Sequence, residues 1–154
     1  MNVQYINPVL ISMLNVLKTM AQMDPKPGKP SIKNDNASPG VVTGMMDMNT
    51  DSVKGSIAIS FTGPVILDVA QRMMHEEFTE VNEIVADLTG EITNMVTGGA
   101  KAIFQEKGIN FAMSLPKVLT GENHLIQHAG NGPTVSLPFN SDKGIFYVEI
   151  CFDE

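Results

Sequence analysis

The stretch from Thr79 to Lys107 is the longest segment with helical periodicity, and it constrains the possible folds more than any other part of the chain. At about 100° per residue, its apolar and polar residues fall on opposite sides of a helix. The apolar stripe consists of Val81, Ile84, Val85, Leu88, Ile92, Met95, Val96, Gly99 and Ile103. The polar side consists of Glu80, Glu83, Asp87, Glu91, Asn94, Gly98 and Lys101. With Thr79 as N-cap and Gly108 as stop signal, the stretch predicts an amphipathic helix with one buried side.

Glu91 and Asn94 stand out on the polar side, because residues three apart on a helix are neighbours and their side chains project together. Three small residues surround the pair: Gly90, Thr97 and Gly98. A glycine inside a helix costs about 1 kcal/mol relative to alanine, so glycines beside a solvent-facing pair suggest the close approach of another backbone. An arbitrary E-x-x-N is more often an ordinary solvated surface, and the residues alone leave that alternative open.

The rest of the chain alternates between helical and strand-like patterns. Helices are predicted over residues 7–23, with Asn7 as N-cap and Ser12 on the polar face, and from Gly63-Pro64 to about residues 75–78. The second of these is followed by the long helix after a very short break. Strands are predicted where apolar residues alternate with small or polar ones, at Val41–Met48, Val53–Phe61 and around residues 111–115, 135–139 and 146–152. Pro138 predicts an edge position or a bulge for its strand.

Residues 24–40 contain four prolines and two glycines and could be a domain linker. A single helix precedes them, and one helix cannot stand alone. We therefore expect a long surface connection, with a short edge strand around residues 31–33, inside a single domain spanning residues 1–154. The element order α-ββ-α-α-βββ lacks regular βαβ alternation. It predicts an α+β fold, in which helices pack on a mixed or antiparallel sheet.

The charge balance excludes several classes of partner. Ten basic residues stand against 17 acidic ones, and no cluster of Lys or Arg occurs, so nucleic-acid and anionic-membrane binding are not expected. No apolar run of about 18 residues is present, and the N-terminus lacks a basic region before its apolar residues. A single cysteine is compatible with a reducing compartment. The expected location is the cytoplasm.

Other candidate groups carry weaker signals. His124 and His128 are four residues apart, but their surroundings resemble a loop, and two exposed polar residues are the favoured interpretation. His75 is expected to have a structural role at a helix end. Cys151 alternates with core positions and is expected to be a buried, inert thiol. No metal site is predicted in this chain, and none of these groups indicates a self-contained catalytic pocket.

Four segments of the chain carry a resemblance to a known family. They are DPKPGKPS after the first helix, GSIAISFTG at the end of the first hairpin, DLTGEITNMVTGGAK in the long helix and LPKVLTG after it. Together they resemble the CheC/CheX/FliY chemotaxis phosphatases, and specifically the CheX branch, over essentially the whole chain. The helix pattern is fairly specific in this context, although it departs from the family at Lys101.

The resemblance implies a function that the residues alone do not. Family members hydrolyse the aspartyl phosphate of a phosphorylated receiver domain such as CheY. By this resemblance Glu91 would pair with a lysine of the receiver and Asn94 would orient the attacking water, with further contacts around Asp87 and Gly98. The chain itself would need no cofactor, since the Mg²⁺ and the phosphorylated aspartate belong to the receiver.

The resemblance also bears on assembly and on the number of sites. CheX-type relatives pair into homodimers through their sheets, and an exposed strand edge would permit this here. CheC-type relatives carry two such motifs. The corresponding first helix has Ser12-Met13-Leu14-Asn15 without a glutamate, so one site per chain is expected. A different function stays open as an alternative: a non-catalytic binding module that sequesters a receiver domain or a flagellar component.

Overall fold

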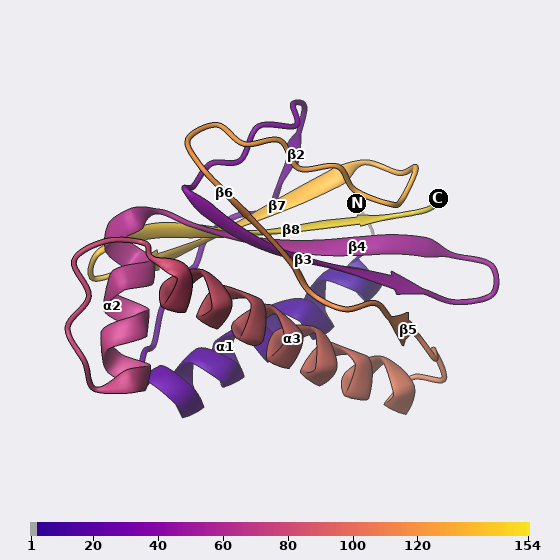
Figure 1. Cartoon of the computed structure of the whole chain (residues 1–154). Coiled ribbons are helices and arrows are strands. Elements are labelled where there is room, and N and C mark those ends of the chain that lie inside the picture. The colour runs from indigo at the N-terminus through magenta and orange to yellow at the C-terminus, as the bar shows by residue number, and fades with distance from the viewer. Residues whose placement is uncertain (1–2) are drawn as a thin grey trace.

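One antiparallel sheet carries the helices on one of its faces (Figure 1). The computed structural model describes residues 3–154. Its helices are α1 (Val3–Ala21), α2 (Gly63–Met74) and α3 (Glu83–Glu106). Its strands are β1 (Lys26–Pro27), β2 (Ser31–Lys33), β3 (Val42–Asn49), β4 (Lys54–Phe61), β5 (Ala112–Met113), β6 (Lys117–Thr120), β7 (Thr134–Ser141) and β8 (Gly144–Phe152). The predicted α+β class is therefore confirmed, and the sheet is antiparallel rather than mixed.

Two long hairpins form the centre of the sheet. Strand β3 pairs with β4 from Val42 opposite Phe61, and β7 pairs with β8 from Thr134 opposite Cys151. Strand β4 then pairs with β8, which joins the two hairpins into the order β1-β7-β8-β4-β3-β5. Short strands complete both edges, because β2 pairs with β7 and β6 pairs with β3.

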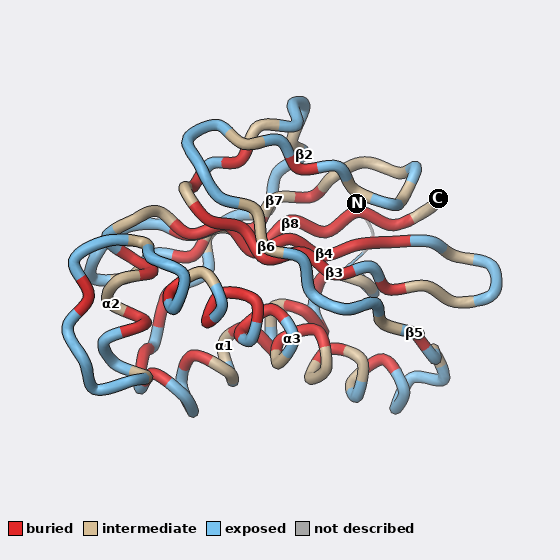
Figure 2. Tube along the Cα trace, viewed as in Figure 1, coloured by how far each residue is buried: buried red, intermediate tan, exposed pale blue. Residues whose placement is uncertain are grey.

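The core lies between the sheet and the helices, where the buried segments of Figure 2 converge. Alternation along the strands places their large apolar residues toward the helices. Phe146 stacks on both Phe61 and Phe139, with ring centroids 5.2 and 5.0 Å apart, respectively. The helices contribute fully buried residues from their inner faces, among them Val9, Met13, Leu17, Ile66, Ile92, Val96 and Phe104. This layer fixes how α3 lies on the sheet.

The boundaries of two predicted helices were wrong. Helix α3 begins after Asn82, whose side chain accepts a hydrogen bond from the backbone N–H of Val85 at 3.0 Å. Thr79 is therefore not the N-cap, and residues 75–82 form a connection instead of a very short break. Helix α1 begins before Asn7, since Tyr5 stacks on Phe152 with ring centroids 4.6 Å apart and draws the first turn onto the sheet.

The strand predictions held for the hairpins and failed after α3. Strand β2 occupies residues 31–33, where a short edge strand was predicted. The alternating segment 111–115 forms only the two-residue β5, and β6 was not predicted at all. Leu115, which shares one side of the alternating pattern with the buried Phe111, is 89% exposed between the two strands. Periodicity misled here because so short a segment is ordered by its pairing with β3, not by its own pattern.

Pro138 lies in an inner strand, at a point where the neighbouring pairing is interrupted. Its carbonyl accepts a hydrogen bond from Gly28 N–H at 2.7 Å, on the side of β7 that faces β1 and β2. Both backbone polar groups of an antiparallel residue point to the same side, so the N–H that proline lacks falls between these two short strands. Pro138 therefore lies in neither the edge strand nor the bulge that was predicted. It lies opposite the gap between β1 and β2, where no partner for an N–H is needed.

Candidate functional site

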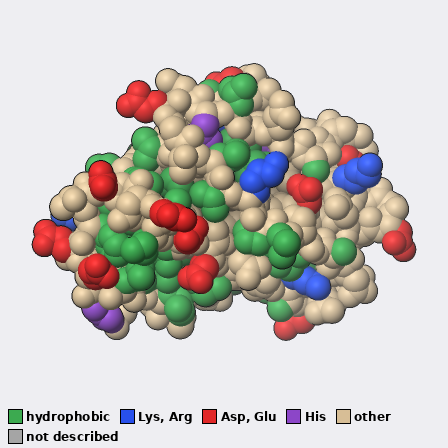
Figure 3. All heavy atoms as spheres, viewed as in Figure 1, with side chains coloured by type: hydrophobic (Ala, Val, Ile, Leu, Met, Phe, Trp, Pro, Cys, Tyr) green, Lys and Arg blue, Asp and Glu red, His purple; other side chains and the backbone are tan. Residues whose placement is uncertain are grey.

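The solvent-facing side of α3 presents the residues that the sequence singled out. Asp87, Glu91 and Asn94 are exposed, and Gly98 is half-buried with nothing within 4 Å of the position that a Cβ would take. Figure 3 views the molecule from the side on which α3 lies in front, and acidic side chains spread across this face among hydrophobic ones. The polar stripe predicted from periodicity is therefore the exposed stripe of the helix.

A ladder of threonines holds the opposite side of α3 against the sheet. Each of Thr89, Thr93 and Thr97 is fully buried and donates its hydroxyl to the carbonyl four residues earlier, at 3.0, 2.8 and 2.7 Å. Strand β3 places Gly44 directly beneath Thr93, where a Cβ would overlap the threonine hydroxyl. Because Thr93 immediately precedes Asn94, this close contact fixes the height of the Glu91–Asn94 turn above the sheet.

Helix α1 holds the same turn from the side. Ser12 is buried and donates its hydroxyl to the carbonyl of Val96 at 2.6 Å. Gly99 faces this serine, and a Cβ there would overlap the Ser12 hydroxyl oxygen. Packing against Ser12 thus explains why the apolar stripe has a glycine at position 99. The placement of Ser12 on the polar face of its helix was wrong, because that side of α1 packs on α3.

Gly90 and Thr97, two of the three small residues around the pair, are small for a reason other than the approach of a partner. Gly90 is buried, and a Cβ there would lie 3.0 Å from Val118 Cγ2 on β6. Thr97 belongs to the buried threonine ladder. Of these three residues only Gly98 leaves open space over the helix. Close approach of a partner is therefore possible at Gly98, while Gly90 serves the packing of α3 on the edge strand.

The chemistry of this surface is that of one carboxylate and one carboxamide. Glu91 can accept hydrogen bonds from a cation, and Asn94 can both donate to and accept from a water molecule. Across residues 3–154, no group of three or more His, Cys, Asp or Glu side chains is arranged to hold a metal ion. The two side chains can thus bind a cation and orient a water molecule.

The predicted exposure of His124 and His128 was wrong. Both rings attach the loop over residues 121–132 to the sheet face opposite the helices. His124 Nε2 lies 2.6 Å from Thr43 Oγ1, and its Nδ1 lies 2.6 Å from the Gly121 carbonyl. His128, with only 7% of its side chain exposed, lies between Ser56 at 2.7 Å and Glu149 at 3.0 Å. The sequence offered one signal of these contacts. In a strand such as Ser56–Ser60, serines alternate with apolar residues, and the buried serines and Glu149 lie on this outer face.

Ser56, His128 and Glu149 have the residue types of a hydrolytic triad, but their burial argues against that role. Ser56 and Glu149 are 0% and 1% exposed, so a substrate cannot reach the hydroxyl. Lys33 adds an ion pair to the second carboxylate oxygen of Glu149 at 2.8 Å. The chain Lys33–Glu149–His128–Ser56 is a structural clasp that holds β2 and the 121–132 loop on the outer face.

Cys151 is buried, as predicted. Its thiol lies 3.4 Å from the carbonyl oxygens of Gly130 and Gly132, and burial raises the pKa of the thiol above its ordinary value. A thiol that stays protonated is a poor nucleophile, so Cys151 does not form a reactive site.

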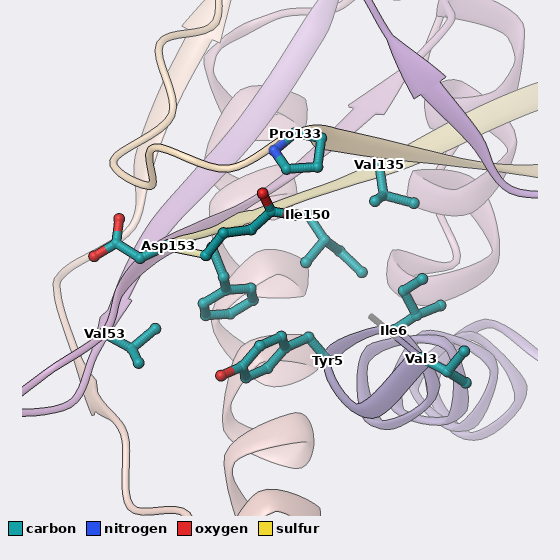
Figure 4. Close-up of a pocket in the computed structure, with 10 residues that line it drawn as sticks. Val3, Tyr5, Ile6, Val53, Pro133, Val135, Ile150 and Asp153 are labelled. Carbon is teal, nitrogen blue, oxygen red and sulfur yellow. The ribbon is translucent and has the colours of Figure 1, made fainter. Parts of the chain in front are cut away.

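A hollow of about 700 Å³ lies at the N-terminal end of α1, away from the Glu91–Asn94 turn (Figure 4). Its walls are mainly apolar, with Tyr5 and Ile6 on one side and Pro133, Val135 and Ile150 on the other. The Asp153 carboxylate at its rim accepts hydrogen bonds from the backbone N–H groups of Lys54 and Asn131, both at 2.9 Å. None of the predicted site residues lines it. No helix within residues 3–154 is long and apolar enough to cross a membrane.

Comparison with known proteins places this surface in a family context. The family model described as chemotaxis phosphatase CheX matches residues 42–140, which include α3 with Glu91 and Asn94. A curated relative, the CheY-P phosphatase CheX of Thermotoga maritima, is 24% identical over 131 residues that cover 84% of both chains.

Solved structures share the whole fold. A CheC-like superfamily protein from Shewanella sp. PV-4 is 48% identical, covers 100% of both chains and gives a TM-score of 0.93. A chain from the CheX-CheY-BeF3-Mg²⁺ complex of Borrelia burgdorferi is 29% identical, with a TM-score of 0.82 and coverage of 97% of this chain and 98% of that one. The similarity therefore extends over the sheet and all three helices.

Proposed function

Since this chain belongs to the CheX family of chemotaxis phosphatases, we propose that it dephosphorylates the aspartyl phosphate of a phosphorylated CheY-like receiver domain. The observation that carries the proposal is the exposed pair Glu91 and Asn94, held on a firmly packed turn of α3 within the matched region. The name of the Thermotoga maritima relative, a CheY-P phosphatase, supports the same reaction.

In the proposed mechanism the two residues have separate tasks. Glu91 binds a lysine of the receiver through an ion pair, which holds the two proteins in register. Asn94 enters the receiver's site and orients a water in line with the phosphorus. The water oxygen bonds to phosphorus, the bond to the aspartate oxygen breaks, and the aspartate leaves as a carboxylate. Since an acyl phosphate is already reactive, placing the water is a sufficient contribution.

The metal of the reaction belongs to the partner. The Borrelia burgdorferi complex contains Mg²⁺ together with CheY and BeF3, which supports a metal site on the receiver. In this chain the Glu91 carboxylate and the Asn94 carboxamide would stay outside the metal's ligand shell. Their contribution is to hold the partner and to orient the water.

Docking requires more surface than the pair itself. An exposed Glu–Lys ion pair contributes less than about 1 kcal/mol, so neighbouring residues have to share the contact. Asp87 lies one turn before Glu91 on the exposed side, and Gly98 lies one turn after Asn94 with open space above it. Both are therefore proposed as partner contacts.

We expect one such site per chain. Ser12 takes the position of the glutamate in the corresponding segment of α1, and it is buried against α3 instead of facing a partner. We also propose a cytoplasmic homodimer that forms through the sheet, where the short outer strands β2 and β6 leave backbone edges for pairing. Sedimentation at micromolar concentration tests this assembly, and a mass of 16.7 kDa at all concentrations would contradict it.

Phosphate release from a phosphorylated CheY in the presence of Mg²⁺ tests the proposed function. The wild-type protein should accelerate release, and Asn94→Ala should slow the accelerated rate by about 10²-fold, since a misplaced water costs about 2.7 kcal/mol of activation free energy. Glu91→Ala should chiefly raise KM. If neither substitution slows release, the assignment is wrong. If the protein binds CheY without accelerating release, it is a non-catalytic module that sequesters its partner.

A further inference from the structure

Ile84 is exposed, although its place in the helical pattern predicted that it would be buried. It is 48% exposed in the first turn of α3, while Val85 beside it is fully buried. Seven residues separate Ile84 from Glu91, which is two turns, so the two side chains differ by only about 20° in direction and by about 10.5 Å along the axis. Ile84 therefore belongs to the exposed stripe that carries Glu91 and Asn94.

Leu115 gives a second exposed apolar group on the other side of the pair. The chain leaves α3 at Lys107, turns through β5 and runs back beside the helix as β6 (Figure 1). Leu115 lies between β5 and β6 and is 89% exposed. Val118 on β6 lies against Gly90, and Leu115 is three residues earlier, at most about 10 Å along an extended chain. Leu115 thus flanks the C-terminal half of α3.

Interface size indicates that a docked protein would reach both residues. A specific complex buries about 800 Å² on each partner, equal to a disc of about 16 Å radius. Ile84 lies within that radius of Glu91, and Leu115 lies within it of Gly90, next to Glu91. A partner whose contact is of this size and is centred near Glu91 would therefore reach Ile84 and Leu115 as well.

Charge around these residues indicates the chemistry of the partner surface. Glu83, Asp87 and Glu91 are exposed at four-residue intervals on the side of α3 where Ile84 lies. An apolar contact surrounded by charged groups is the usual anatomy of a protein interface, with a dry centre and a polar rim. The matching surface is apolar beside its phosphorylated carboxylate and carries basic groups around that patch.

We propose that Ile84 and Leu115 are the apolar contacts that hold the phosphorylated receiver on α3, one on either side of Glu91 and Asn94. The proposal rests on the function proposed above. It separates Asn94, which acts at the phosphate, from the docking contacts, in which Ile84 and Leu115 join Glu91. Loss of a docking contact therefore raises KM and leaves the step at the phosphate intact.

Steady-state phosphate release from phosphorylated CheY tests this division. Ile84→Ala and Leu115→Ala should each raise KM by about 3- to 10-fold, with kcat changing far less, because each removes apolar area that the complex buries. Leu125→Ala is the matched control, since Leu125 is 64% exposed in the 121–132 loop, on the sheet face opposite the helices. All three variants alter exposed side chains, and thermal unfolding verifies that each is folded.

Each outcome separates the inference from the function on which it rests. An unchanged KM in both variants would overturn the docking role, and so would a KM raised equally by Leu125→Ala. In either case an effect of Asn94→Ala would keep the phosphatase assignment. A loss in kcat instead of KM would overturn it too, because Ile84 and Leu115 would then act on the chemical step. If Asn94→Ala has no effect either, the proposed function itself fails.

Discussion

At Gly98 the stability of α3 favours alanine, whereas the proposed docking of a partner favours glycine. The position above Gly98 is open, so an added methyl group meets no atom of this chain. A glycine in a helix interior costs up to about 1 kcal/mol relative to alanine, and the buried structure gives no reason to retain it. The open space is therefore better explained by a partner than by the fold.

Gly98→Ala should accordingly stabilise the protein and weaken docking. We expect the free energy of unfolding to rise by up to about 1 kcal/mol in urea titration, because alanine restricts the unfolded chain and favours helix. The same variant should raise KM for phosphorylated CheY, since the added Cβ occupies the contact surface. A stabilised variant with unchanged KM would show that no partner approaches Gly98.

At the scale of the residue, periodicity predicted the exposure of Glu91 and Asn94 correctly, because the two lie at the centre of the polar side of an amphipathic helix. It failed for Ile84, which lies at the margin of the apolar stripe and is exposed. Gly90 was assigned to the same open surface, yet it is small because Val118 lies against it. That contact joins residues far apart in the sequence, and periodicity carries no information about it.

At the scale of the element, the clasp Lys33–Glu149–His128–Ser56 holds two irregular segments on the outer face of the sheet. Lys33 comes from β2, Glu149 from β8 and His128 from the 121–132 loop. The Glu149 side chain is 1% exposed, so its charge depends on these partners for compensation. The clasp explains how a Pro- and Gly-rich connection and a long loop become ordered parts of the fold.

Removal of one partner of this ion pair should be costly. Lys33→Met leaves a buried carboxylate without its cation, and we expect the free energy of unfolding to fall by about 3 kcal/mol in urea titration. Adding Glu149→Gln removes the charge itself and should recover part of the loss. If the double variant is no more stable than Lys33→Met alone, the ion pair is not the source of the effect.

A second carboxylate ties strand ends together and makes stability depend on pH. Hydrogen bonds from the backbone N–H groups of Lys54 and Asn131 hold the pKa of Asp153 below its ordinary value of 3.8. Because the folded pKa is lower than the unfolded one, this contribution is fully present above about pH 4 and is lost as the pH falls through the folded pKa.

Comparison of the wild-type protein with Asp153→Asn between about pH 3 and pH 6 checks this dependence. The wild type should be the more stable of the two at the upper end, and the difference should shrink as the carboxylate is protonated. A difference that stays constant over the range would mean that the Asp153 charge plays no part in it.

Elements with strong internal patterns were predictable, and elements defined by their neighbours were not. The two hairpins and the body of α3 followed from periodicity because burial on one side selects their residues. The start of α3 at Asn82 did not, since Thr79 offers an equally good cap and tertiary packing decides between them. Strand β6 escaped prediction because it has no alternation of its own and is ordered by β3.

At the scale of the whole molecule, the sheet and helices serve to present one turn of α3. The segment from Gly90 to Gly99 is contacted by three residues from different elements: Gly44 of β3, Val118 of β6 and Ser12 of α1. The α+β class and the order of the three helices and two long hairpins could be predicted from the chain alone. The three-sided support could not, because it depends on close contacts among β3, β6 and α1. The proposed mechanism uses this support, since orienting a water requires a side chain that is held in place.

The most direct test of the account is the rate of a single turnover with the protein in large excess over phosphorylated CheY. At saturation this rate reports the chemical step and is independent of docking. Asn94→Ala should lower it by about 10²-fold, while the affinity for CheY activated with beryllofluoride and Mg²⁺ stays close to that of the wild type. A saturated Asn94→Ala complex that releases phosphate at the wild-type rate would contradict the assignment of water placement to α3.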